Sequence, residues 1–529
     1  MIHLKWIGSP REISFDIEGM SKKLKNNAIP CYVVKDLSGR IGVTNSGTIQ
    51  STGNGLFLKA IVPAFTAEDF GEASFKEDYQ LKYAYKAGAM ANGIASTNLV
   101  IALGKNEMMG SFGAAGMIPA RVEEAIATIQ KALPTQTYAC NLIHSPIEKA
   151  LEEGAVNLYI RHGVKVVEAS AYMNLSEQIV KYRAVGLSLD AQGEIVIANK
   201  VIGKISRKEV ATRFMSPAPI QFLDNLLAAG KITKQQHELA QKVPMADDIT
   251  VESDSGGHTD NRPLVVLFPI ILQLRDEIQE KYQYKKLIRV GAAGGIGTPA
   301  SALAAFTMGA AYVVTGSINQ ACIESGTSEA VKELLSKVAS TDVTMAPASD
   351  MFELGVELQV LKRGTLFGAR AKKLYELYNR YDSIDAIPED ERAALEKRTF
   401  KMTLDEVWNG CVSFFEERDP EQIEKAKGNP KRKMALIFRW YLGLSSNWAN
   451  AGVPERVMDY QIWCGPAMGA FNEWTKGSSL SDAKNRKVAE VGSHILDGAA
   501  YLHRINTIKN QGVALPLELL HLDIQDGTV

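Results

Sequence analysis

A regular alternation of short apolar segments with amphipathic helical segments, between residues 82 and 317, is the feature that most constrains the fold. Eight segments have the length and composition of strands, and helix-like stretches such as 120–133, 176–185 and 263–282 fall between them. Eight strand-then-helix units predict a closed parallel (β/α)8 TIM barrel of the α/β class over a doubly wound sheet. The expected strands are 82–88, 108–113, 137–143, 164–170, 200–206, 248–253, 287–293 and 311–317.

The stretches outside this alternation have different patterns. Short apolar runs, such as CYVV (31–34) and LFLKAIV (56–62), are separated by glycine-containing turns, which predicts a small β-rich N-terminal subdomain. A helical insertion is expected between the fifth and sixth strands. After about residue 325 the pattern is helical to the end and rich in charge and tryptophan, which predicts a helical lid or extension. The expected division is 1–78 for the subdomain, 79–340 for the barrel with its insertion at 207–245, and 341–529 for the helical region.

Charge and cysteine usage exclude several classes of protein. A formal net charge of -1 gives no basic field for nucleic acid or an anionic membrane. The five cysteines are scattered and form no CxxC pair, so we expect neither a disulfide framework nor a metal site, and a reducing cytoplasm fits. The longest apolar run, about 263–272, is half of the roughly 20 residues that a membrane-spanning helix needs. We therefore expect a soluble cytoplasmic protein without a signal peptide.

A glycine-rich turn after the seventh expected strand is the strongest phosphate-binding signal. In RVGAAGGIGTPASALAAF (289–306) a strand runs into Gly294 and Gly295 and then into a helix. Glycine lets main-chain N–H groups approach a phosphate, and the N-terminus of a helix favours an anion. The eighth strand ends in Gly316 and Ser317, and phosphate sites built from the loops after strands seven and eight recur in these barrels. The alternative is a tight strand-to-helix turn without a ligand.

A histidine after two glycines is the candidate for proton transfer. In ADDITVESDSGGHTDNRP (246–263) the sixth strand is followed by Gly256, Gly257 and His258. The glycines would let the main chain lie against a flat ring, and the histidine would point into the barrel mouth. The alternative is a loop histidine that is hydrogen-bonded to nearby carboxylates. His144 is the nearest rival among the other histidines.

The first strand also ends in small residues that suit contacts to the edge of a flavin ring. An N-cap by Ser96 accounts for part of this pattern. The ends of the third and fifth strands add an asparagine and a lysine, and a lysine near the flavin would stabilise the anionic reduced ring. The alternative for the lysine is a solvated strand end. The candidates are Met90, Ala91, Asn92, Gly93, Asn141 and Lys204.

These motifs together resemble the PfaD family, the stand-alone enoyl reductases of bacterial polyunsaturated-fatty-acid synthases. Related trans-acting enoyl reductases serve polyketide synthases, and the wider superfamily holds nitronate monooxygenases and FMN-dependent enoyl-acyl-carrier-protein reductases. The first 50 or so residues match loosely, so no role is carried over to them. The resemblance rests on AGAMANGIAS, VEASAY, NKVIGKISR, ADDITVESDSGGHTDNRPL, VGAAGGIGTP, MAPASDMFELGVELQVLKRGTLF and NPKRKMALIFRWYLGLSSNW.

The resemblance implies an FMN-dependent enzyme that uses NADPH to reduce the double bond of enoyl thioesters on acyl carrier protein domains. It makes His258 the active-site histidine, either as proton donor or as the group that polarises the thioester carbonyl. It places the FMN phosphate at Gly294, Gly295, Gly316 and Ser317, and the flavin ring near Met90, Ala91, Asn92 and Asn141. A homodimer is compatible with it. Acyl chain length, stereochemistry, and a fatty-acid or polyketide pathway stay open.

Two alternatives and one docking hypothesis complete the expectations. The chain could be a nitronate monooxygenase-like oxidase, or a non-catalytic scaffold subunit of a synthase. The basic residues of 425–440, among them Lys431, Arg432 and Lys433, could form a docking patch for an acidic carrier protein. The alternative for this segment is a solvated helix start with an apolar face.

Overall fold

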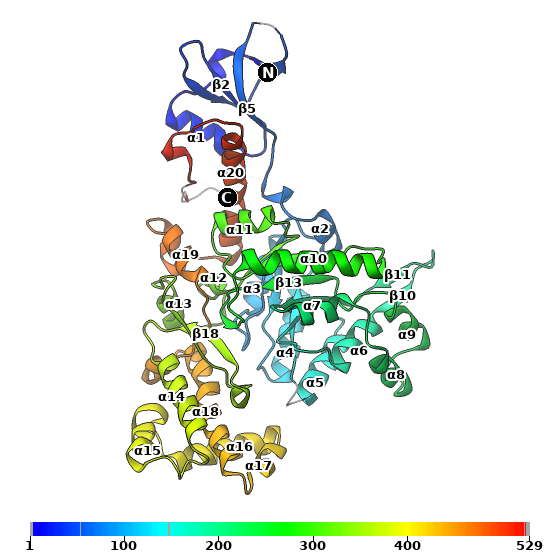
Figure 1. Cartoon of the computed structure of the whole chain (residues 1–529), viewed down its shortest axis with the longest axis vertical. Coiled ribbons are helices and arrows are strands. Elements are labelled where there is room, and N and C mark those ends of the chain that lie inside the picture. Colours follow the sequence, from blue (N-terminus) through cyan, green and yellow to red (C-terminus); the bar gives the residue numbers. More distant parts are fainter. Residues whose placement is uncertain (1–3, 53, 146–148, 523, 525–529) are drawn as a thin grey trace.

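A computed structural model describes residues 4–52, 54–145, 149–522 and 524 of the chain (Figure 1). It confirms the predicted barrel, because eight parallel strands close in the order β12-β13-β15-β16-β6-β7-β8-β9. Each expected strand segment contains one of them. Most of their residues are buried, as expected for strands covered on both faces. The strands are β6 (Tyr85–Ala87), β7 (Met109–Phe112), β8 (Ala139–Ile143), β9 (Val166–Ser170), β12 (Lys200–Ile205), β13 (Asp248–Glu252), β15 (Arg289–Ala293) and β16 (Val313–Thr315).

Seven helices follow the first seven barrel strands and cover the outside. Their starts are set by local capping: the side chain of Ser96 accepts from Leu99 N, and Ser176 accepts from Ile179 N. Thr298 and Ser301 form a reciprocal capping box after the glycine-rich turn. The helices are α3 (Thr97–Lys105), α4 (Pro119–Ala132), α5 (Lys149–Arg161), α6 (Glu177–Val185), α7 (Lys208–Met215), α10 (Leu264–Tyr282) and α11 (Pro299–Thr307).

The eighth barrel position is filled by a helix from the far end of the sequence, α20 (Val488–Asn510). Its first half packs on α11 and α3 and belongs to the main core. Two glycines permit the close approach: a Cβ at Gly498 would lie 2.5 Å from Cγ of Pro299, and one at Gly492 would lie 3.1 Å from the Tyr85 ring. The segment from β16 to α20 is therefore a long insertion into the last unit of the barrel. The cut expected at residue 340 separates α20 from the barrel on which it packs.

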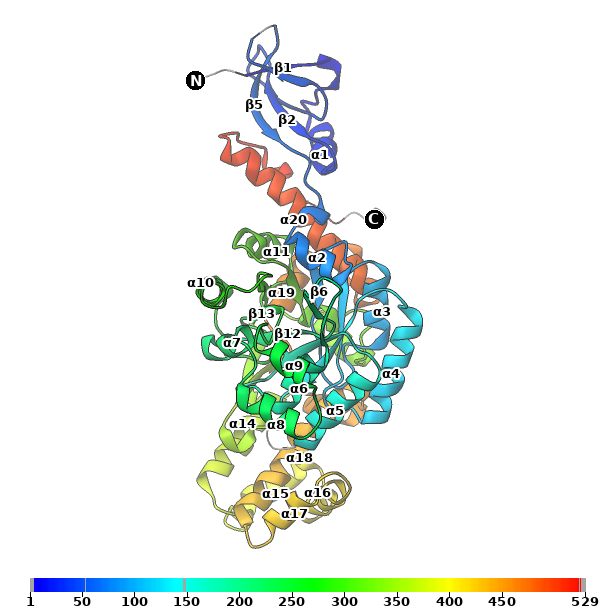
Figure 2. The same ribbon diagram turned by 90° about the vertical axis from the view of Figure 1, so that its right-hand side faces the viewer.

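The second half of α20 holds the N-terminal subdomain, which lies at one end of the molecule (Figures 1 and 2). The expected β-rich character is confirmed by a five-stranded sheet of order β3-β2-β5-β1-β4. Tyr501, Ile505 and Ile508 of α20 share a core with that sheet and with α1 (Ile17–Lys25). A short helix, α2 (Ala73–Tyr79), leads into the barrel. The strands are β1 (Lys5–Ile7), β2 (Cys31–Lys35), β3 (Ile41–Thr44), β4 (Thr48–Gln50) and β5 (Leu56–Val62).

The expected insertion at 207–245 is helical, but its first helix, α7, is the barrel's own fifth helix and packs on α10. The additional helices are α8 (Ile220–Ala228) and α9 (Lys234–Ala240), which pack on α6. The structure also has a hairpin of β10 (Leu187–Leu189) and β11 (Ile195–Ile197), which the sequence pattern did not predict.

The expectation of helix alone after residue 325 is wrong. Two antiparallel strands, β17 (Val343–Pro347) and β18 (Glu357–Leu361), pair with the short β14 (Gly257–His258) in a three-stranded sheet of order β14-β18-β17. This pairing joins residues about a hundred positions apart, so local pattern does not reveal it. The helices of the inserted region are α12 (Ser317–Gln320), α13 (Glu329–Leu335), α14 (Phe367–Arg380), α15 (Glu389–Leu395), α16 (Leu404–Arg418), α17 (Glu421–Ala426), α18 (Pro430–Ala451) and α19 (Ala467–Trp474).

Within the described ranges, no helix is both long enough and apolar enough to cross a lipid bilayer.

Candidate functional site

A cavity of about 900 Å³ lies at the carboxyl ends of the barrel strands and is closed on its other side by the inserted region. Every barrel strand except β7 contributes residues at or just after its end, where barrel enzymes carry their active sites. Most of the site residues predicted from the sequence line it. Gly93 does not line it, because its N–H donates to the Gly113 carbonyl and it supports the turn behind Asn92. The predicted residues that do line it are Met90, Ala91, Asn92, Asn141, Lys204, Gly256, Gly257, His258, Gly294, Gly295, Gly316 and Ser317.

The two glycine loops after β15 and β16 present open main chain to the cavity. Gly294 and Gly295 have φ of 83° and 70°, in the left-handed region that favours glycine. A Cβ added at Gly295 or Gly316 would meet nothing within 4 Å. No acceptor for the N–H groups of Gly295 and Ile296 exists among the described residues. Open space and unpaired donors at one place are what an anionic group needs.

A segment of the inserted region, 463–467, closes over these loops. Ser317 Oγ accepts a hydrogen bond from Gly465 N at 2.9 Å. Main chains touch where side chains are lacking: a Cβ at Gly256 would lie 2.8 Å from Cys464 N, and one at Gly465 would lie 2.9 Å from Gly256 N. The glycine pair before His258 therefore serves close packing of the inserted segment, besides any role toward a ring.

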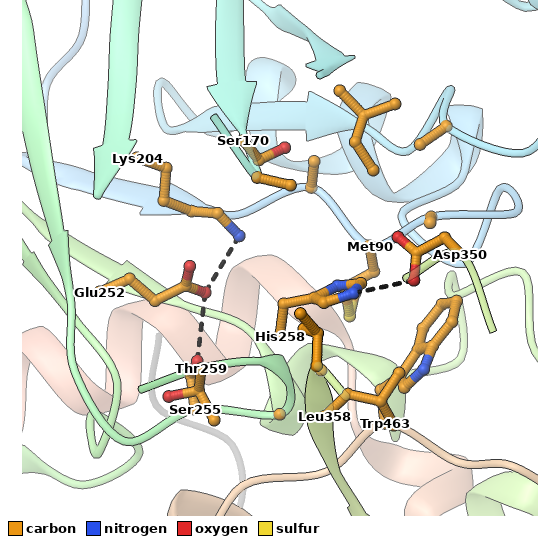
Figure 3. Close-up of a pocket in the computed structure, with 18 of the residues that line it drawn as sticks. Met90, Ser170, Lys204, Glu252, Ser255, His258, Thr259, Asp350, Leu358 and Trp463 are labelled. Atoms are coloured by element: carbon orange, nitrogen blue, oxygen red, sulfur yellow. Dashed lines mark hydrogen bonds and ion pairs between the residues drawn. The ribbon is translucent and has the colours of Figure 1, made fainter. Parts of the chain in front are cut away.

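His258 is paired with a carboxylate that the sequence pattern did not identify (Figure 3). Its Nε2 lies 3.1 Å from Oδ1 of Asp350, which follows β17. Burial opposes a charge on the imidazole, but the hydrogen bond and the negative charge of Asp350 outweigh it and raise the pKa of His258. Burial would likewise raise the pKa of Asp350, and the bond to His258 overcomes this and lowers it. The pair therefore favours the imidazolium, a proton donor, next to the cavity.

Lys204 reaches the same cavity from the end of β12 (Figure 3). Its Nζ lies 3.0 Å from Oε1 of Glu252, which ends β13, and Ser255 Oγ donates to the same oxygen at 3.2 Å. The lysine is thus a paired and mostly buried group, which excludes the alternative of a solvated strand end.

A buried glutamate holds the loop that carries Met90, Ala91 and Asn92. Oε1 of Glu168 accepts from Ala89 N at 3.1 Å, and Oε2 accepts from Ser111 Oγ at 2.8 Å and from Lys86. Asn141 Nδ2 donates to Ser170 Oγ at 2.6 Å beside it. Sequence reasoning missed Glu168, Lys86 and Glu252, although a charge inside an otherwise apolar strand was the signal available for each.

The other candidates suggested by the sequence have local partners. His144 lines the cavity, but its Nδ1 is 3.1 Å from Oε2 of Glu152 and its ring stacks on Tyr172 at 4.8 Å. The basic segment does not form the free docking patch that we expected. Lys431 donates to the carbonyl of Tyr381 at 2.6 Å, and Arg432 pairs with Glu353 at 2.5 Å. These charges bind neighbouring elements of the same chain and are half-buried, so they are not available to a carrier protein.

Comparison with known proteins agrees with this architecture. Residues 6–64 match the model of the fatty acid synthase subunit PfaD N-terminal domain, and residues 381–460 match the inserted helical domain of [acyl-carrier-protein] S-malonyltransferase. A crystal structure of the enoyl reductase domain of MlnA from the macrolactin cluster of Bacillus amyloliquefaciens is 41% identical, with a TM-score of 0.80. That match covers 83% of this chain and 99% of the domain. FabK from Thermotoga maritima, at 16% identity and a TM-score of 0.50, shares the fold.

Longer proteins contain the same sequence type. A polyunsaturated fatty acid synthase subunit of Thraustochytrium sp. is 49% identical over 94% of this chain. The polyketide biosynthesis protein PksE of Bacillus subtilis is 45% identical over 92% of it. The chain spans 33% of the length of the first and 62% of the second.

Proposed function

Because the chain belongs to the PfaD family of enoyl reductases, we propose that it is an FMN-dependent, NADPH-using reductase of enoyl thioesters. The observation that carries the proposal is the convergence, in one cavity, of the open glycine loops after β15 and β16 with the His258–Asp350 pair. The first can hold a phosphate and the second can deliver a proton. A scaffold subunit would need neither.

The residues present fit FMN. The N–H groups of Gly295 and Ile296 have no acceptor among the described residues, and the open space at Gly295 and Gly316 leaves room for the phosphate. Loop 88–92 and Asn141 would border the flavin ring. Lys204 would offer a positive charge to the ring, balanced by Glu252. Bound FMN would supply hydride transfer from NADPH to the β-carbon of the enoyl thioester.

The protein's own part in the reaction is proton delivery and charge stabilisation. His258 is held by Asp350 with its raised pKa, so it stays protonated at neutral pH more readily than a free histidine. In that state it can hydrogen-bond the thioester carbonyl, stabilise the developing enolate and donate the proton that the α-carbon requires. Segment 463–467 and the inserted helices cover the barrel mouth and exclude water from this step.

The partner and pathway follow from the company that the relatives keep. Two of them are named as synthase or polyketide biosynthesis proteins, so we propose that the substrate is presented on an acyl carrier protein domain of such an assembly. The basic segment 425–440 is not the docking site, because Lys431 and Arg432 are bound within the chain.

Steady-state assays test the proposal against its main rival. The protein should oxidise NADPH anaerobically when an enoyl thioester is added, and should yield the saturated thioester. A nitronate monooxygenase-like oxidase would consume oxygen with a nitroalkane and leave the thioester unchanged. The second result would overturn the proposal.

A further inference from the structure

The cavity continues beyond the barrel mouth into a channel between α16 and α18. One face of α18 lines it, with residues at helical spacing, and α16 lines it with a matching face. The channel residues are Cys411, Phe414 and Phe415 of α16 and Leu436, Arg439, Trp440, Gly443 and Leu444 of α18.

The channel starts at the proposed flavin edge. Asn92 Nδ2 donates to Ser446 Oγ at 3.2 Å, so this part of α18 lies on loop 88–92. Leu436 lies ten residues away on the same helix, which corresponds to about 15 Å. A long occupant could therefore have one end at His258 and the other between the two helices.

The chemistry of the channel favours an uncharged, apolar occupant. Its lining is aliphatic and aromatic apart from Arg439. That guanidinium lies 3.4 Å from Oε1 of Glu353, so its charge is already compensated. The phosphates of a dinucleotide would lack cationic partners here, whereas each methylene that leaves water strengthens binding by about four-fold.

A glycine in the middle of α18 gives the channel its width. Gly443 stands inside a 22-residue helix, where glycine costs stability relative to alanine. A Cβ added there would meet nothing within 4 Å, because the position faces the channel. Any larger side chain at 443 would occupy the channel without needing the helix to move.

We propose that this channel holds the alkyl chain of the substrate and that the size of residue 443 limits the chain length accepted. The proposal rests on the proposed function, since it assumes an enoyl thioester as substrate. The reacting double bond lies at the barrel mouth beside His258, and the distal carbons extend between α16 and α18.

The test is Gly443→Leu, with Gly154→Leu as a matched control. Gly154 also lies inside a helix with nothing within 4 Å of an added Cβ, but it is exposed on α5 and outside the cavity. Rates are compared for crotonyl and trans-2-dodecenoyl pantetheine. Binding of butyryl and dodecanoyl pantetheine, which cannot react, is measured by calorimetry.

Gly443→Leu should lower kcat/KM for the dodecenoyl substrate by at least about ten-fold and weaken dodecanoyl binding to match. Its crotonyl rate should stay within about two-fold, and Gly154→Leu should change neither. An equal loss for both chain lengths would overturn the proposal and assign the channel to the pantetheine arm. Slower flavin reduction by NADPH with unchanged thioester kinetics would overturn it in favour of the nicotinamide cofactor. If wild-type protein reduces no thioester at all, the proposed function itself fails.

Discussion

The two walls of the cavity differ in chemistry and in origin. The barrel wall carries open glycine loops, His258 and the Lys204–Glu252 pair, all at strand ends. The inserted wall, from α12 to α19, is mostly apolar but supplies Asp350 and the segment that covers the glycines. This contrast indicates that the barrel provides the reacting groups, while the insertion orients them and selects the substrate.

The largest effect should come from the phosphate loop of the barrel wall. Gly295→Val would force a β-branched residue into φ of 70° and fill the open space, so FMN should bind at least about a hundred-fold more weakly. Gly230→Val is the matched control, because Gly230 has φ of 65° and open surroundings but lies outside the cavity. Flavin titration by fluorescence measures both. Full FMN occupancy in folded Gly295→Val protein would refute the assignment.

Removing the proton donor should break the chemistry and spare the cofactor. His258→Ala should retain FMN and reduction by NADPH, and should slow the enoyl half-reaction by about 10²–10⁴-fold. Rapid-mixing absorbance separates the two half-reactions. His162→Ala, at a histidine paired with Glu123 on the outside of the barrel, serves as control. Unchanged reoxidation by enoyl thioester would make His258 a structural residue.

Asp350 tests whether the inserted wall tunes the barrel wall. The raised pKa of His258 keeps the imidazole protonated to higher pH, so the enoyl half-reaction should slow as pH rises through that value. Asp350→Asn removes the charge that raises this pKa, and the fall should then begin at lower pH. At alkaline pH the rate should drop by about ten-fold relative to wild type, which corresponds to one pKa unit. An unchanged pH profile would show that Asp350 does not position or tune His258.

The smallest effect concerns the contact that joins the walls. Ser446→Ala removes the hydrogen bond from Asn92 and should lower the free energy of unfolding by about 1 kcal/mol. Denaturant unfolding measures it, and crotonyl reduction should be little changed. A loss of flavin in this variant would instead show that α18 fixes the flavin loop.

The barrel could be predicted from the sequence because each of its units is local. The strand-to-helix rhythm located all eight strands, and the glycine turns and His258 follow strand ends that the pattern defines. Thr298 follows the glycine turn, and its side chain caps the next helix by accepting from Ser301 N. Such features depend on a few neighbouring residues, so one sequence is enough to reveal them.

The remainder depends on contacts between distant residues. The pairing of β14 with β18, the contact of Asp350 with His258 and the return of α20 to the barrel each join segments far apart in the chain. Nothing near Asp350 distinguishes it from other loop aspartates. The docking hypothesis for the basic segment failed for a related reason, because the partners of Lys431 and Arg432 lie on other elements.

The most direct test of the central claim is a set of visible absorption spectra on one anaerobic sample of the purified protein. The account predicts a yellow protein that NADPH bleaches and that crotonyl pantetheine restores, with FMN released on heating. A protein that stays colourless after incubation with FMN, or a bleached flavin that no enoyl thioester reoxidises, would contradict it.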